Sequence, residues 1–169
     1  MHQDARSFAI HAHGDQKYGT RPYVDHLDEV AALARPYGEE AEVVAYLHDT
    51  VEDTDVTLAD VEARFGAKVA ACVALLTDEP GATRKERKAK TYAKLATVSG
   101  PLELALLVKA ADRLANVRAC VRDGNQRLWQ VYQGEHATFR PAAYRPGLCD
   151  PLWSELDGLL TPGTADAEG

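Results

Sequence analysis

The chain has few cysteines, and they are spaced in a way that argues against two common uses of the residue. Cys72, Cys120 and Cys149 are the three cysteines among 169 residues, and no two of them form a C-x-x-C pair. An odd number of widely spaced thiols suggests neither a disulfide framework nor a zinc knuckle. We therefore expect three buried, small apolar side chains in a reducing compartment.

Long apolar runs and a surplus of positive charge are also missing. No apolar run approaches the ~18 residues that a membrane span needs, and residues 1–6 lack the basic and apolar regions of a secretion signal. The formal net charge of -7 argues against general nucleic-acid binding, because such binding requires a basic face that displaces counterions from phosphates. We expect a cytoplasmic protein that binds neither nucleic acid nor membrane.

The pattern of apolar residues predicts a single all-α domain. No segment alternates apolar and polar residues with the period of two that is typical of strands, whereas helical spacing recurs between breaks made by glycine and proline. The domain is expected to cover residues 1–160, and residues 161–169 are expected to form a disordered tail. The predicted helices cover residues 4–16, 23–35, 38–52, 58–65, 67–76, 83–97, 101–121, 126–138 and 149–160.

An unusual group of polar residues lies at the end of the predicted 38–52 helix. His48 and Glu52 are four positions apart, as are Asp49 and Asp53, so they would be neighbours on the helix surface. Three clustered carboxylates repel one another and raise each other's pKa unless a cation compensates them. A divalent metal is the simplest compensation, and a solvated acidic helix end is the alternative.

Two further candidates for metal ligands lie far away in the chain. Asp112 is in the middle of the most apolar predicted helix, where an ionised carboxylate is costly unless it is paired or bound to metal. It could instead pair with Arg113 or Lys109, or face solvent. His26 is the remaining candidate, although a single histidine is more often a structural or surface residue.

Together these residues would form a set of two imidazoles and two carboxylates from three helices. The set comprises His26, His48, Asp49 and Asp112. Mixed nitrogen and oxygen ligands without thiolate suit manganese, iron, zinc or cobalt better than calcium, which prefers oxygen alone.

The order and spacing of these residues resemble the HD-domain metal phosphohydrolases, and within them the alarmone hydrolases: the hydrolase domains of RelA/SpoT proteins and the small stand-alone (p)ppGpp hydrolases of the Mesh1 type. The string His-Asp-Thr-Val-Glu-Asp-Thr at 48–54 is specific, whereas a bare His-Asp pair is weak. The similarity covers about residues 6–120. The other matching segments are Ala12-His13 with Gln16, Pro22-Tyr23, Leu76-Thr77-Asp78, Glu86-Arg87-Lys88 and Lys109 to Arg118.

The resemblance implies an HD-type helical bundle with a mononuclear metal site in its core cleft. His26, His48, Asp49 and Asp112 would bind one Mn²⁺-like ion. Glu52 and Asp53 would position or deprotonate the attacking water. The implied reaction removes the 3′-pyrophosphate of guanosine tetra- or pentaphosphate, giving GDP or GTP and pyrophosphate.

A substrate with several phosphates requires basic contacts, because one metal ion cannot neutralise two diphosphates. The richest local supply is the basic run at 84–90, from which we select Lys85 and Arg87; a solvated helix face is the alternative for the run. By resemblance, Lys17 lies in the early substrate loop and Asn116 beside the nucleotide. Tyr132 could stack on the base or be a core aromatic residue.

Histidines outside the proposed metal set are expected at the surface, as exposed polar residues or caps. These are His2, His11, His13 and His136.

Two other functions remain open. The chain could hydrolyse another nucleotide or a 3′-phosphorylated dinucleotide cofactor, or it could be an HD module that binds nucleotide without turning it over. Retention of both Glu52 and Asp53 argues against the second alternative, since a binding module needs neither. In every case the expected partner is a small-molecule nucleotide, and the sequence leaves a homo-oligomer open.

Overall fold

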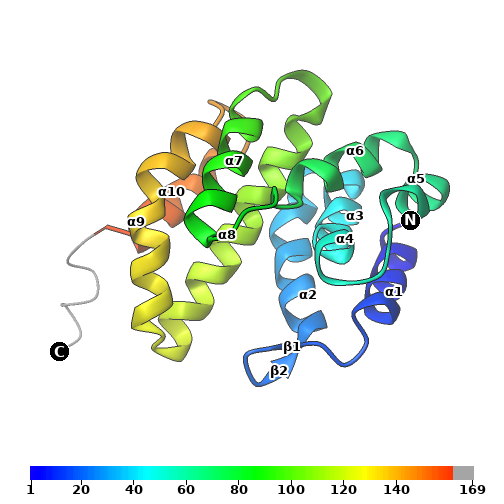
Figure 1. Ribbon diagram of the computed structural model, residues 1–169, viewed down its shortest axis with the longest axis horizontal. Coiled ribbons are helices and arrows are strands. Elements are labelled where there is room, and N and C mark those ends of the chain that lie inside the picture. Colours follow the sequence, from blue (N-terminus) through cyan, green and yellow to red (C-terminus); the bar gives the residue numbers. More distant parts are fainter. Residues whose placement is uncertain (162–169) are drawn as a thin grey trace.

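A computed structural model describes residues 1–161 as a helical bundle with one very short hairpin (Figure 1). The predicted all-α class is therefore confirmed. Residues 162–169 of the predicted tail lie outside the described residues. The elements are α1 (His2–His13), β1 (Lys17–Tyr18), β2 (Arg21–Pro22), α2 (Tyr23–Ala34), the 3-10 turn η1 (Arg35–Tyr37), α3 (Glu39–Leu47), α4 (Thr50–Asp53), α5 (Leu58–Phe65), α6 (Ala67–Leu76), α7 (Arg84–Ala96), the 3-10 turn η2 (Gly100–Leu102), α8 (Glu103–Asp123), α9 (Gln126–Ala143) and α10 (Asp150–Leu159).

Helix α8 is the central element of the bundle. It packs against α2, α3 and α6 on one side and against α9 and α10 on the other, while α7 packs mainly on α9 (Figure 1). Its apolar side chains are almost all buried. The helix ends where Gly124 adopts a left-handed conformation (φ 67°, ψ 27°), which glycine reaches without the steric penalty of a Cβ atom.

Several predicted helix ends are confirmed by the local contacts. Thr57 caps α5: its hydroxyl accepts from the amide of Asp60, and the Asp60 carboxylate accepts in return from the amide of Thr57. This reciprocal capping box satisfies two amides at the start of the helix. All three cysteines are buried and free, as expected.

Two predicted helices differ from those observed. The helix predicted at 126–138 is longer than expected, because α9 continues to Ala143 with Pro141 inside the helix and buries Ala142 and Ala143. The predicted 38–52 helix is interrupted at His48 and Asp49, so that it becomes α3 and the short α4. This interruption shapes the site described next. Among residues 1–161, no helix is both long and apolar enough to span a membrane.

Candidate metal centre and cavity

The four predicted metal ligands converge in the interior of the bundle. His26 comes from α2, His48 and Asp49 from the junction of α3 and α4, and Asp112 from the middle of α8. Each offers one ligand atom, and these atoms all lie within 4.8 Å of one another. His48 Nε2 lies 3.0 Å from Asp49 Oδ2 and 3.2 Å from Asp112 Oδ1, and His26 Nε2 lies 3.0 Å from the same oxygen of Asp112.

Side-chain hydrogen bonds at the α3–α4 junction orient His48. His48 Nδ1 donates to the carbonyl of Ala45 (2.6 Å), and the Thr50 hydroxyl donates to the carbonyl of Leu47 (2.8 Å). Side chains thus satisfy carbonyls at the end of α3 where the helical hydrogen bonding stops. Because Nδ1 is used as a donor, Nε2 of neutral His48 carries a lone pair that points at the carboxylates, which is the tautomer that a metal-binding histidine needs.

The residues present fit a divalent cation. His48 is only 2% exposed, and its Nε2 is buried without a hydrogen-bond partner although two carboxylate oxygens lie beside it. Asp49 and Asp112 are largely shielded from water, with side chains 15% and 14% exposed, and two such carboxylates in close proximity favour a positive charge between them. The donor set of two imidazole nitrogens and two carboxylate oxygens is typical of manganese, iron or zinc.

The pKa shifts of the cluster show the same demand for positive charge. Burial alone would lower the pKa of His48, but the carboxylates of Asp49 and Asp112 raise it well above its ordinary value. Burial likewise opposes ionisation of both aspartates. The neighbouring His48 charge nevertheless lowers the pKa of Asp49 to about 2 and, together with His26, holds that of Asp112 well below its usual range. The direction of these shifts shows that the cluster favours a positive charge among its carboxylates, which a bound cation would supply.

The hairpin and the start of α2 add a ring of contacts around the ligands. The Tyr18 ring stacks on that of His26, with centroids 4.5 Å apart and planes 7° from parallel. The Tyr18 hydroxyl donates to Asn116 Oδ1 (2.7 Å), and Asn116 Nδ2 donates to Asp112 Oδ1 (3.3 Å). The Tyr23 hydroxyl donates to Asp49. Such contacts fix the orientation of ligand side chains.

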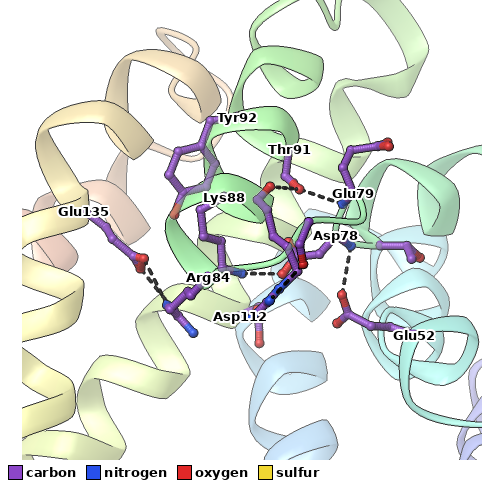
Figure 2. A network of polar contacts seen from close by, with 12 residues as sticks. Glu52, Asp78, Glu79, Arg84, Lys88, Thr91, Tyr92, Asp112 and Glu135 are labelled. Carbon is purple, nitrogen blue, oxygen red and sulfur yellow. Dashed lines mark hydrogen bonds and ion pairs between the residues drawn. The ribbon is translucent and has the colours of Figure 1, made fainter.

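A cavity of about 290 Å³ opens beside the ligand cluster. Glu52 and Asp53, the two predicted catalytic residues, line it together with three of the ligands. Glu52 accepts a hydrogen bond from the backbone amide of Asp78 (2.8 Å; Figure 2), and partial burial raises its pKa despite this bond. A carboxylate whose pKa is raised towards neutrality is a better proton acceptor.

Asp53 is held by a chain of side chains that begins on α1. His13 Nδ1 donates to Gln16 Oε1 (2.8 Å), and Gln16 Nε2 donates to Asp53 Oδ2 (3.1 Å). His13 is buried rather than exposed, so its expected surface position is wrong. His136 also departs from that expectation, since it is largely shielded and pairs with Asp157 (2.7 Å).

Four basic side chains also line the cavity. Arg84 and Lys88 come from α7, and Lys109 and Arg113 come from α8. Figure 2 shows Arg84 directed at Glu135 and Lys88 directed at Asp78; the nearest N–O distances are 3.0 and 2.7 Å. The cavity therefore holds cations as well as carboxylates, as a phosphorylated ligand bound to a metal would require.

Some predicted substrate residues lie elsewhere. Lys17 and Lys85 are exposed, and Arg87 donates to the carbonyl of Gly81; none of the three lines the cavity. Arg84 and Lys88 line the cavity instead, because residues four apart lie on one face of α7. The sequence thus identified the basic segment, but it did not show which face of the helix lines the cavity.

Asn116 and Tyr132 lie at a junction of two cavities. Both line the charged cavity and also a neighbouring one of about 250 Å³, which is formed partly by the hairpin and the end of α8. Tyr132 is buried, and the Arg113 guanidinium lies 4.7 Å from the centre of its ring. Tyr132 is therefore a core aromatic residue that also reaches the cavity wall.

Besides Arg84 and Lys88, four residues of the cavity wall were not predicted to line the site: Lys109, Arg113, Asp78 and Tyr23. A usable signal existed for the first, because Lys109 precedes Asp112 by three residues and so shares its helix face. Arg113 and Asp78 reach the cavity through tertiary packing, which spacing along the chain does not reveal.

This fold and site define a class: all-α proteins with a buried His/Asp cluster able to hold a metal ion beside a charged cavity. Residues 5–149 match the HD domain family. The chain belongs to that family.

Individual relatives agree with the assignment. A protein of Danio rerio called guanosine-3′,5′-bis(diphosphate) 3′-pyrophosphohydrolase MESH1 is 39% identical over 140 residues, which are 75% of this chain and 76% of the relative. An Aquifex aeolicus guanosine-3′,5′-bis(diphosphate) 3′-pyrophosphohydrolase is 33% identical over 155 residues, or 90% of this chain. The chain spans 22% of the Aquifex protein and 66% of the mouse MESH1 protein, which is 41% identical.

A solved structure has the same fold. It is that of a metazoan ortholog of SpoT that hydrolyses ppGpp and has a role in starvation responses. The TM-score is 0.79 at 27% identity, and the match covers 94% of this chain and 92% of the other.

Proposed function

We propose that this protein hydrolyses the 3′-pyrophosphate of guanosine tetra- and pentaphosphate, using one divalent metal ion, most suitably Mn²⁺. The observation that carries the proposal is a cavity beside the four-residue ligand cluster that is lined by two further acids and by four basic side chains. The choice of substrate rests on the MESH1 relatives and on the metazoan SpoT ortholog, which hydrolyses ppGpp.

The metal ion would be held by His26, His48, Asp49 and Asp112. When bound, it would lower the pKa of water and shield charge on phosphoryl oxygens. Mn²⁺ suits this set of nitrogen and oxygen donors.

Two acids of the chain act on the attacking water. Glu52, whose pKa is raised, accepts that proton, and Asp53, fixed by Gln16, directs the water towards phosphorus. The water oxygen bonds to the phosphorus next to the ribose 3′ oxygen, and the bond between that phosphorus and the 3′ oxygen breaks. The 3′ oxygen takes up a proton equivalent to the one that Glu52 accepted and then releases, so the products are pyrophosphate and a nucleotide with a free 3′-hydroxyl.

The remaining wall residues bind the substrate. Arg84 and Lys88 are the phosphate contacts that the cavity offers from α7, in place of Lys85 and Arg87. Asn116 retains its proposed place beside the nucleotide because it lies where the two cavities meet. The nucleoside would then extend towards the hairpin.

A nucleotide panel tests the proposal. Purified protein freed of metal is assayed with and without Mn²⁺ against ppGpp, pppGpp, a 3′-phosphorylated dinucleotide cofactor and ordinary nucleotides, with release of pyrophosphate and phosphate measured separately. We expect metal-dependent release of pyrophosphate from the two alarmones. Phosphate from the dinucleotide alone would favour the other hydrolase, and tight ppGpp binding without turnover would favour a binding module.

The cytoplasmic location inferred from the sequence stays a prediction. A homo-oligomer remains open. Cell fractionation and light scattering on the purified protein test the two.

A further inference from the structure

Lys109 is an unusual buried cation. It lies on α8 one helical turn before Asp112, lines the cavity and is only 6% exposed. Within residues 1–161, no hydrogen bond or ion pair of its ammonium group is found. The stem of Lys109 is buried, while its ammonium group is open to the cavity. A charge that forms no ion pair adds little to stability, so a lysine in this position calls for another reason.

The other cations of the wall already have partners. Arg84 pairs with Glu135 and Lys88 with Asp78 (Figure 2). Arg113 donates to the Tyr92 hydroxyl (2.7 Å) and lies near Glu135. An anion that bound to these three would have to share or replace existing contacts, whereas Lys109 is available to it directly.

The surroundings of Lys109 place its charge close to the reaction. Lys109, Glu52 and Asp78 line the same cavity. The charge of Lys109 lowers the pKa of Asp78 and opposes the rise in that of Glu52, so its ammonium group is near both acids, although it pairs with neither. The ligand Asp112 is on the same helix face. A cation beside the metal ligands and the proposed base, but bonded to neither, is suited to contact the group undergoing reaction.

We propose that the ammonium group of Lys109 binds the pyrophosphate group that is removed from the substrate, an inference that rests on the proposed hydrolase function. Lys109 contacts non-bridging oxygens of the phosphoryl group that the single metal ion leaves uncompensated. The contact persists in the product, so inorganic pyrophosphate is its simplest ligand.

The test replaces Lys109 by methionine, which keeps the length of the side chain and removes its charge. Lys68→Met is the control, because Lys68 is exposed on α6 and pairs with Glu40. Inorganic pyrophosphate is titrated into Mn²⁺-loaded protein, and ppGpp kinetics and thermal unfolding are measured in parallel. We expect Lys109→Met to weaken pyrophosphate binding roughly 10- to 100-fold, the effect of one charge-assisted hydrogen bond, and to lower kcat/KM at least as much.

Thermal unfolding separates this role from a structural one. Removal of an unpaired buried charge should leave the Tm unchanged or raise it, and Lys109→Arg should recover part of the pyrophosphate affinity. A fall in Tm by more than about 5 °C in Lys109→Met, or failure of that variant to fold, would assign Lys109 a structural role and overturn the proposal. Pyrophosphate affinity equal to that of Lys68→Met would also overturn it.

The two proposals fail in different ways. If the wild-type protein binds pyrophosphate through Lys109 but releases none from ppGpp, the hydrolase function is wrong and the binding role stands. If ppGpp is hydrolysed equally by the wild-type and Lys109→Met proteins, the hydrolase stands and the role of Lys109 is wrong.

Discussion

The residues around Glu52 change the pKa of its carboxyl group in the direction that a general base requires. Its carboxyl is partly shielded from water, and the negative charges of Asp49 and Asp78 lie near it, so its pKa is raised. The amide of Asp78 and the charge of Lys109 oppose this rise without cancelling it. Its raised pKa makes the Glu52 carboxylate a stronger proton acceptor than an unperturbed glutamate.

This shift predicts a pH dependence. At saturating Mn²⁺, kcat/KM should fall with acidification around a midpoint above 4.5, the ordinary value for glutamate, because the proposed base becomes protonated there. Glu52→Gln should reduce kcat by roughly 10²- to 10⁴-fold, the usual contribution of a general base, and its residual activity should lack this acidic limb. Glu62→Gln, at an exposed position on α5, is the control. Unchanged kcat in Glu52→Gln would remove Glu52 from the mechanism.

At the scale of elements, the segment from the end of α1 to the start of α2 orients side chains of the metal-ligand cluster and of the proposed catalytic pair. His13 and Gln16 hold Asp53, while Tyr18 and Tyr23 contact His26 and Asp49. Gln16 has no titratable proton, so its contribution is orientation. His13 donates from Nδ1 and thereby fixes the carbonyl side of the Gln16 amide towards itself, which leaves the amide nitrogen to face Asp53.

Substitution of Gln16 by methionine should separate orientation from metal binding. Without the donor to Asp53, we expect kcat to fall about tenfold, comparable to the loss of one hydrogen bond to a charged group, while KM and the stabilisation by Mn²⁺ stay near wild-type values. Gln130→Met, at an exposed position on α9, controls for the substitution itself. Loss of Mn²⁺ binding in Gln16→Met would show that Gln16 supports the metal site rather than Asp53.

At the scale of the whole molecule, the ligand cluster connects α2, the α3–α4 junction and α8. A bound ion would therefore link elements that lie as far apart in the chain as His26 and Asp112. Binding to the folded state alone stabilises it by mass action.

Metal removal should accordingly lower thermal stability. With Mn²⁺ at ~100 times its Kd, the gain is about 2.7 kcal/mol, or a Tm rise of roughly 5–10 °C for a chain of this size. Chelation should reverse the rise, and Asp112→Asn should abolish it, whereas Asp15→Asn, at an exposed loop position, should not. A Tm that is indifferent to Mn²⁺ in the wild-type protein would contradict the metal site. Binding should weaken at acidic pH, because the histidines must be neutral to bind metal.

By itself the sequence determined the helical class, most helix positions and the residues able to bind metal. Helical periodicity reports which face of each segment is apolar, and the type and order of His26, His48, Asp49 and Asp112 limit the chemistry that they can perform. Periodicity does not report how faces from distant segments meet. The interruption at His48, the burial of His13 against Tyr23, and the position of Arg84 and Lys88 rather than Lys85 and Arg87 in the cavity wall depend on how distant segments pack. Only the tertiary structure decided them, because burial and pairing of a polar side chain depend on neighbours that are remote along the chain.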